Sequence, residues 1–346
     1  KHDMIDRIRL QKVFDDLPHK TLAVVGDLFL DQYLQLDSTL TETSIETGLD
    51  AYQVTAMNLC PGAAGTVLNN LSALTAGHLN VVSIIGEDGA GFELKRLLHQ
   101  QNMDLSQLIV SSDRWTPTYT KPMLQIPDQS SQELNRFDTK NRIRTPASLQ
   151  EQICDHLDFI FQHVDGIIVS DQVPEPDCGI LTSRVRSCLC KLATKHPDVI
   201  CLVDSRSHID CYRNVWLKPN LEECIRAVKS LSPLEEYETP EGYALALAKH
   251  SGTRLFCTLG EEGMIYCEGI HTTRLPGYSA GGAVDIVGAG DSASAGILCG
   301  LCCGLSAQEA GTLGNLVASI TVQQIGTTGT ATPLEVLEQW KNCHAG

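Results

Sequence analysis

The segment LNVVSIIGEDGAGFELKRLLHQQ, residues 79–101, changes its hydrophobic period part-way along. Residues 79–85 form a short, nearly continuous apolar run, which is typical of a buried strand. Gly86–Gly91 reads as a turn, and from Phe92 to Gln101 apolar side chains return at helical spacing. A strand, a short turn and a helix form the repeating unit of a parallel α/β sheet, so this stretch predicts that fold class.

The same alternation extends over most of the chain. Strands are expected at 21–25, 166–169, 200–203, 216–217, 254–258 and 264–267, and helices at 4–17, 66–76, 149–161, 180–195 and from 291 onward. Two excursions, about 34–59 and 114–138, are instead irregular and strand-like. We expect a doubly wound, mostly parallel sheet with helices on both faces, and short strands in the two excursions that pair as a small β lid. An N-terminal helix at 1–19 precedes one domain at 20–346.

Composition restricts the class of protein. The chain has 346 residues, 42% of them hydrophobic, and a formal net charge of −16. Such a charge argues against a nucleic-acid or anionic-membrane partner. The 14 cysteines lack the spacing of a disulfide framework or a metal site, which favours reduced thiols in a cytoplasmic protein. No stretch resembles a signal peptide or a membrane span.

A glycine-rich turn at a helix start carries the strongest chemical signal. Gly288-Ala289-Gly290-Asp291 follows an apolar turn and precedes a helix of small residues. Free N–H groups and the helix dipole at such a start favour a phosphate. An Asp at that position can accept the proton of an attacking hydroxyl. An ordinary helix cap after a tight turn is the alternative interpretation.

Two further turns follow predicted strands. Asn220 and Glu223 lie one helical turn apart, where an amide and a carboxylate can hold water around Mg²⁺. A capping box explains the same spacing equally well. Thr258, Gly260 and Gly263 form a glycine-bearing turn, which a simple hairpin also explains.

Polar residues also follow the first strand. Asp27 and Asp31 lie at its carboxyl end, where open α/β sheets bind ligands, and their carboxylates can bind sugar hydroxyls. Asp27 as a simple turn cap is the alternative. The small residues Gly62 and Ala63 precede a helix and allow a polar ligand to approach the backbone closely.

Taken in this order, the motifs resemble the ribokinase/phosphofructokinase-B carbohydrate kinase family over about residues 20–335. The resemblance implies an ATP-dependent kinase that phosphorylates a sugar hydroxyl, with Mg²⁺ and a monovalent cation as cofactor candidates. It implies that Asp291 is the catalytic base, beside an anion hole of Gly288, Ala289 and Gly290. ATP is assigned to Asn220, Glu223, Thr258, Gly260, Gly263 and Asn315, with Glu223 holding Mg²⁺ through water. The sugar is assigned to Asp27, Asp31, Gly62, Ala63, Thr66, Arg136 and Asp138.

Within that family the chain looks most similar to the heptose-7-phosphate kinases. The features that carry this similarity are Gly26-Asp27 to Asp31, Arg136-x-Asp138, Ser170-Asp171, Leu217-Lys218-Pro219-Asn220 and the spacing from Asp291 to Asn315. A basic cluster of Arg136, Lys140, Arg142 and Arg144 can grip a substrate phosphate. Edge-strand cations that prevent aggregation are the alternative interpretation of this cluster.

Four positions depart from the family pattern: Ala63 replaces a Gly, Thr66 an Asn, Val287 a Thr and Arg206 a Lys. These changes alter the acceptor pocket, so the acceptor stays open between a heptose phosphate, another sugar or sugar phosphate, and a nucleoside. A catalytically silent binding protein is a further alternative, although it would have no need of Asp291. An exposed face of the lid sheet favours a homodimer.

Overall fold

A nine-stranded sheet forms the centre of the molecule in the computed structural model, which describes residues 5–279, 281–326 and 328–344. Its strands are β1 (Thr21–Gly26), β6 (His78–Gly86), β7 (Leu108–Ser111), β11 (Gly166–Asp171), β12 (Ile200–Ser205), β13 (Trp216–Leu217), β14 (Leu255–Thr258), β15 (Gly263–Glu268) and β16 (His271–Pro276). Their order is β16-β15-β14-β13-β12-β11-β1-β6-β7. Every pair from β14 to β7 is parallel, and β15 and β16 add an antiparallel edge. The predicted mostly parallel sheet is thereby confirmed.

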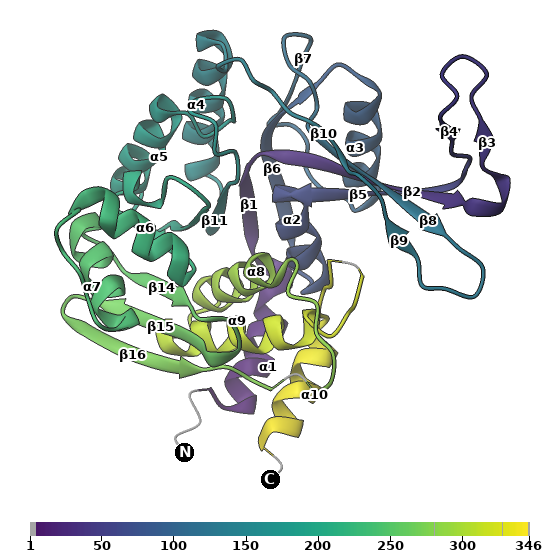
Figure 1. Cartoon of the computed structure of the whole chain (residues 1–346). Coiled ribbons are helices and arrows are strands. Elements are labelled where there is room, and N and C mark those ends of the chain that lie inside the picture. The colour runs from purple at the N-terminus through teal and green to yellow at the C-terminus, as the bar shows by residue number, and fades with distance from the viewer. Residues whose placement is uncertain (1–4, 280, 327, 345–346) are drawn as a thin grey trace.

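Helices cover both faces of this sheet (Figure 1). One face packs against α1 (Arg7–Asp16), α2 (Ala64–Ala73), α3 (Gly89–Gln100), α8 (Ala289–Cys302), α9 (Ala307–Thr321) and α10 (Pro333–His344). The other packs against α4 (Ala147–Phe161), α5 (Ser183–Lys195), α6 (Leu221–Leu231) and α7 (Pro240–Ser251). The expected N-terminal helix is α1, and residues 1–4 of that expectation lie outside the described residues.

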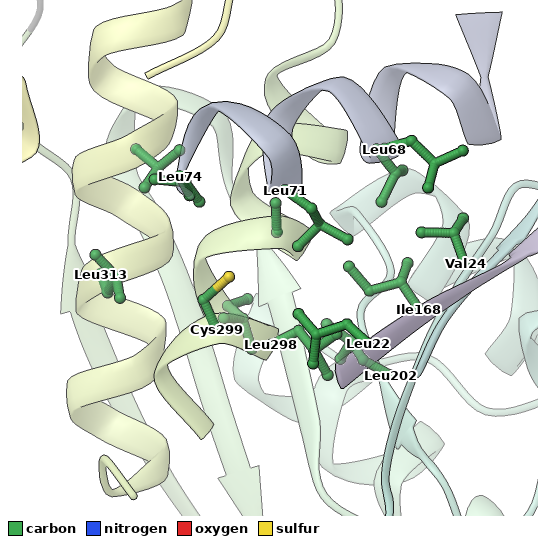
Figure 2. Close-up of a cluster of buried hydrophobic side chains, with 14 of the residues drawn as sticks. Leu22, Val24, Leu68, Leu71, Leu74, Ile168, Leu202, Leu298, Cys299 and Leu313 are labelled. Atoms are coloured by element: carbon green, nitrogen blue, oxygen red, sulfur yellow. The ribbon is translucent and has the colours of Figure 1, made fainter. Parts of the chain in front are cut away.

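Alternation along the strands separates two apolar cores. In β1, Leu22 and Val24 point into the core with α2, α8 and α9, whereas Ala23 and Val25 point into the opposite core. Figure 2 shows Leu22 and Val24 gathered with leucines of α2 and α8. Because α2 and α8 share this core, the two glycine-bearing helix starts are held against the same sheet.

A second, five-stranded sheet stands apart from the central one (Figure 1). It contains β2 (Leu28–Asp37), β5 (Val54–Ala63), β8 (Thr118–Gln125), β9 (Gln132–Glu133) and β10 (Phe137–Thr139), in the order β10-β8-β2-β5 with β9 on β8. A hairpin of β3 (Glu42–Thr43) and β4 (Asp50–Ala51) projects at its far end. The strands expected over 34–59 do lie outside the central sheet, and β3 and β4 are short as expected. The expectation that all of them are short is wrong, because β2 and β5 pair at nine positions.

The junction between β5 and α2 holds a backbone conformation that normally requires glycine. Ala63 has φ 52° and ψ −116°, a region in which an L-residue meets steric strain. The preceding Gly62 is needed for another reason, since a Cβ there would lie 2.9 Å from the carboxylate of Asp31. The family's usual second glycine would therefore fit position 63 without strain.

Ala63→Gly is accordingly expected to stabilise the protein by about 1 kcal/mol. Strain of this kind costs ~1–3 kcal/mol, and the extra freedom of a glycine in the unfolded chain cancels about 0.4–1 kcal/mol of the gain. Denaturant unfolding of both proteins measures the difference. Ala64→Gly, one position into α2, serves as the control and should destabilise. An Ala63→Gly variant less stable than the parent would contradict the strain.

Candidate active site

Asp291 lies in the first turn of α8, at the carboxyl end of the central strands. Gly288 caps this helix in the left-handed conformation, with φ 82°, which glycine adopts without strain. The amides of Gly290 and Asp291 precede the first i→i−4 bond, which runs from Ser292 N–H to the Gly288 carbonyl over 3.0 Å. Of the residues assigned to the anion hole, Ala289 already donates its N–H to the Ile286 carbonyl at 3.2 Å. The amides of Gly290 and Asp291 are the ones at this turn that can donate to an anion.

A buried ion pair lies beside this turn. The Lys218 ammonium donates to Asp204 Oδ2 at 2.9 Å, and Ser294 Oγ donates to the same oxygen at 3.3 Å. A Cβ at Gly290 would lie 3.7 Å from Lys218 Nζ, so α8 approaches the pair closely. Burial, with a contribution from Asp204, raises the pKa of Asp291 to about 7 against the opposing charges of Lys218 and Arg206. A carboxyl group with such a pKa can accept a proton near neutral pH.

The raised pKa of Asp291 predicts a pH dependence. Because only the ionised carboxylate can accept a proton, kcat/KM should rise with pH through an inflection near 7, the pKa to which burial brings this group. Initial rates between pH 5 and 9 at limiting acceptor concentration measure this limb. The residual turnover of Asp291→Asn should lack it, and a profile that is flat across this range in the parent enzyme would contradict the assignment.

Asn220 and Glu223 form the capping box that the sequence left as an alternative. Asn220 Oδ1 accepts from Glu223 N–H at 2.8 Å, and Glu223 Oε2 accepts from Asn220 N–H at 2.9 Å. Burial raises the pKa of Glu223, and Asp204 adds to this shift, so the carboxylate belongs to the same charged cluster. The described residues contain no converging set of three metal-ligating side chains. The carboxylates present fit a Mg²⁺ that keeps most of its waters.

The remaining ATP candidates meet at the ends of β14 and β16. Thr258 pairs with Asn220 through an isolated bridge, and its N–H donates to the Pro219 carbonyl at 2.9 Å. Asn315 Nδ2 donates to the carbonyls of Leu275 and Pro276 at 3.0 and 3.1 Å.

The two glycines of the same turn are required by its backbone. Gly260 and Gly263 both have positive φ, 63° and 93°. A Cβ at Gly263 would lie 2.2 Å from the carbonyl oxygen of Leu275. Only glycine therefore fits at Gly263, and the turn is held tightly against the end of β16.

Two carboxylates lie near the start of the second sheet. Asp27 Oδ1 accepts from Ile180 N–H at 2.8 Å, while its Oδ2 is buried without a partner among the described residues. Burial raises the pKa of Asp27 to about 7. Asp31 lies 3.8 Å from Lys121 Nζ, and its Oδ1 likewise has no partner in the described part of the chain. Both carboxylates can therefore accept hydrogen bonds from ligand hydroxyls.

Thr66 is buried in the first turn of α2 and connects this region to α8. Its methyl carbon lies 3.6 Å from the position that a Cβ would take at Gly288. The start of α2 and the start of α8 are therefore adjacent, although more than 200 residues separate them in the sequence. This contact places Thr66, one of the predicted sugar-binding residues, next to the turn that carries Asp291.

A cleft opens between the second sheet and the central sheet. Its lining includes Asp27, Arg114, Tyr119, Lys140 and Arg206. The Tyr119 ring packs against Phe29, with ring centroids 4.8 Å apart.

Arg136 and Asp138 stand beside this cleft as a bidentate ion pair, with distances of 2.7 and 2.9 Å. The Arg136 guanidinium lies 4.4 Å from the Tyr119 ring centroid. The Nε and Nη2 donors of Arg136 are therefore already bonded to Asp138.

Comparison with known proteins identifies the family. Residues 22–333 match the pfkB family carbohydrate kinase model. The chain belongs to this family. Two curated relatives are each named bifunctional protein HldE. The one from Trichlorobacter lovleyi is 30% identical over 96% of this chain and 65% of the relative. The one from Geotalea uraniireducens is 29% identical over 98% of this chain and 67% of the relative. The PfkB chain described here thus spans about two thirds of their length.

Solved structures of PfkB-type kinases share the fold. Phosphofructokinase-2 from Escherichia coli, in complex with potassium, superposes with a TM-score of 0.70 at 16% identity, covering 94% of this chain and 99% of that chain. Ribokinase from Thermotoga maritima gives 0.67 at 19% identity, covering 93% and 100%. The architecture is therefore ribokinase-like. Membership of the pfkB carbohydrate kinase family makes this protein a phosphotransferase with an alcohol acceptor. No helix of the described residues is long and apolar enough to cross a membrane.

Sequence reasoning did not select four residues of this PfkB site. Lys218 appears in the sequence analysis only within the motif Leu217-Lys218-Pro219-Asn220, and Arg206 only as a departure without a role. Asp204 and Tyr119 carry no assignment from the sequence. The departure at Arg206 was the one available signal, because it marks a family position whose positive charge, kept by the change from Lys to Arg, acts on Asp291.

Proposed function

We propose that the chain transfers the γ-phosphoryl group of Mg-ATP to a hydroxyl of a sugar phosphate, and that this acceptor is a heptose 7-phosphate. One observation carries the proposal: the cleft between the two sheets is lined by the Asp27 carboxylate, which suits sugar hydroxyls, and by cations that suit a phosphate. The charge of one of these cations, Arg206, also acts on Asp291. The resemblance to heptose-7-phosphate kinases and the similarity to the relatives named HldE support the same acceptor.

In the proposed reaction, Asp291 accepts the proton of the acceptor hydroxyl as its oxygen attacks the γ-phosphorus. The bond from the γ-phosphorus to the β–γ bridging oxygen breaks, and ADP leaves with the electron pair. The amides at Gly290 and Asp291 stabilise charge on the transferring group. Mg²⁺ supplies further neutralisation of the phosphates, and Glu223 would hold it through water.

We further propose that the five-stranded sheet closes over the acceptor as a lid. Its β2 carries Asp31 and its β8 carries Tyr119, so closure would exclude water that could otherwise take the phosphoryl group. The edge strand β5 exposes Val54 and Met57, and pairing of two such lids would give the expected homodimer. Sedimentation analysis of the purified chain tests that assembly.

An acceptor panel tests the proposed reaction. Heptose 7-phosphate, fructose 6-phosphate, ribose, fructose and inosine would each be assayed for ADP release, with products identified by phosphorus NMR. Parallel assays in potassium and sodium salts test the monovalent cation. We expect the highest kcat/KM for a sugar phosphate. A neutral sugar or a nucleoside with a higher kcat/KM than every sugar phosphate would overturn the proposed acceptor class. If no acceptor of the panel gave ADP release, the catalytically silent binding protein would be favoured.

A further inference from the structure

The cations around the cleft differ in whether they already have a partner. Four of them are engaged: Lys121 with Asp31 at 3.8 Å, Arg136 with Asp138 at 2.7 Å, Arg142 with Glu175 at 2.8 Å, and Arg114 with Thr145 Oγ1 at 2.6 Å. An engaged cation can bind an anionic ligand only by giving up or sharing its present partner. The basic cluster of the sequence is therefore less available than its charge suggests.

Among the cations that line the cleft, Lys140 and Arg206 are the exceptions. Arg144 of the basic cluster also forms no ion pair within the described residues, but it does not line the cleft. Within the described ranges, neither the Lys140 nor the Arg206 side chain has a carboxylate within ion-pair distance or donates a hydrogen bond to another residue. Lys140 lies over the Tyr119 ring, 5.7 Å from its centroid, and the charge of Arg206 acts on both Tyr119 and Asp291. Both residues line the same cleft.

The backbone of Arg206 is fixed while its side chain is not. Its N–H donates to the Asp171 carbonyl at 3.0 Å, and its own carbonyl accepts from the Arg226 guanidinium. The Arg206 side chain is exposed at the mouth of the cleft. The protein therefore holds a guanidinium at a fixed point of the central sheet with its donors available to a ligand.

We infer that Lys140 and Arg206 hold the phosphate of the acceptor between the lid and the central sheet, while Arg136 remains paired with Asp138. This assignment rests on the proposed function. Asp27 and Glu175 also line this cleft, but among the described residues neither forms an ion pair with Lys140 or Arg206. In a chain of net charge −16, two cations that face one cleft without an ion-pair partner favour an anion there. The ATP candidates lie elsewhere, at the ends of β14 and β16, so ATP does not account for these two cations.

The two cations come from different sheets. Lys140 follows β10 of the lid, whereas Arg206 follows β12 of the central sheet. A phosphate that contacts both would draw the lid onto the central sheet, because it binds the closed arrangement better than the open one. The preference for a phosphorylated acceptor would then arise from closure of the lid onto the central sheet as well as from the direct contacts of the phosphate with Lys140 and Arg206.

Steady-state kinetics of Arg206→Ala and Lys140→Ala test the assignment with the best sugar phosphate of the panel. Each variant should raise the KM of that acceptor about tenfold or more, since hydrogen bonds to charged groups are lost, and leave the KM of ATP nearly unchanged. Arg206→Lys should recover part of the loss, because it keeps the charge without the planar fork. Arg7→Ala and Lys12→Ala, both exposed on α1, are the matched controls.

The dephosphorylated form of the same sugar isolates the phosphate contact. Its kcat/KM should be low in the parent enzyme and should not fall further in Arg206→Ala. If Arg136→Ala raises the acceptor KM more than Arg206→Ala does, or if Arg206→Ala raises mainly the KM of ATP, the assignment is overturned while sugar-phosphate turnover stands. If no sugar phosphate is turned over, the proposed function itself fails.

Discussion

Asp291→Asn is expected to lower kcat by about 100- to 10,000-fold, the range that a positioned general base contributes. The amide keeps the shape of the side chain in the first turn of α8 but cannot accept a proton. Burial raises the pKa of Asp291 to about 7, so a large share of the side chain is ionised near neutral pH. The loss of kcat should therefore be measurable at neutral pH. ADP release under saturating substrates measures the loss.

Binding should survive this substitution. The Kd of ATP, measured by titration calorimetry, should change little, since the amides of the α8 turn remain in place. Asp155→Asn, an exposed position on α4, controls for the chemical change and should keep full turnover. If Asp291→Asn retained nearly the parent kcat, the general-base role would have to be assigned to another group.

Lys218→Met should lower the free energy of unfolding by about 3–5 kcal/mol, the cost of leaving one member of a buried ion pair alone. Lys218 is 2% exposed and lies 2.9 Å from Asp204. Removal of the ammonium leaves the Asp204 carboxylate buried beside Ser294 Oγ at 3.3 Å, whose single proton is shared with the Gly290 carbonyl at 3.0 Å. Urea unfolding followed by circular dichroism measures the change.

The double variant Asp204→Asn/Lys218→Met separates the two contributions. It should be more stable than Lys218→Met alone, because the Asp204 carboxylate is no longer left buried without its cation. Lys195→Met supplies a matched control: its ammonium is exposed and lies 3.7 Å from Asp158, a pair worth ~0–1 kcal/mol. A Lys218→Met variant within 1 kcal/mol of the parent would show that Asp204 is well solvated or finds another partner.

Local patterns in the sequence were sufficient for most of the central sheet. The apolar runs at 21–25, 79–85 and 200–203 became β1, β6 and β12 within one or two residues of their expected ends. Strands buried on both faces show such runs whatever their neighbours are. The weaker elements were missed: β7 has four residues at the sheet edge, and β16 is largely exposed. Their signals come from pairing with neighbouring strands rather than from hydrophobicity.

The sequence by itself determined the fold class, the family and the glycine turn that places Asp291 at a helix start, because these depend on residues close together in the chain. Only the tertiary structure decided which charged side chains form ion pairs. Lys218 and Asp204 are 14 residues apart and lie at the ends of different strands. The sequence left Arg136 available for a ligand, whereas the structure pairs it with Asp138. Whether a cation is neutralised depends on the distance and burial of every nearby carboxylate, and those distances are fixed by long-range packing rather than by local pattern.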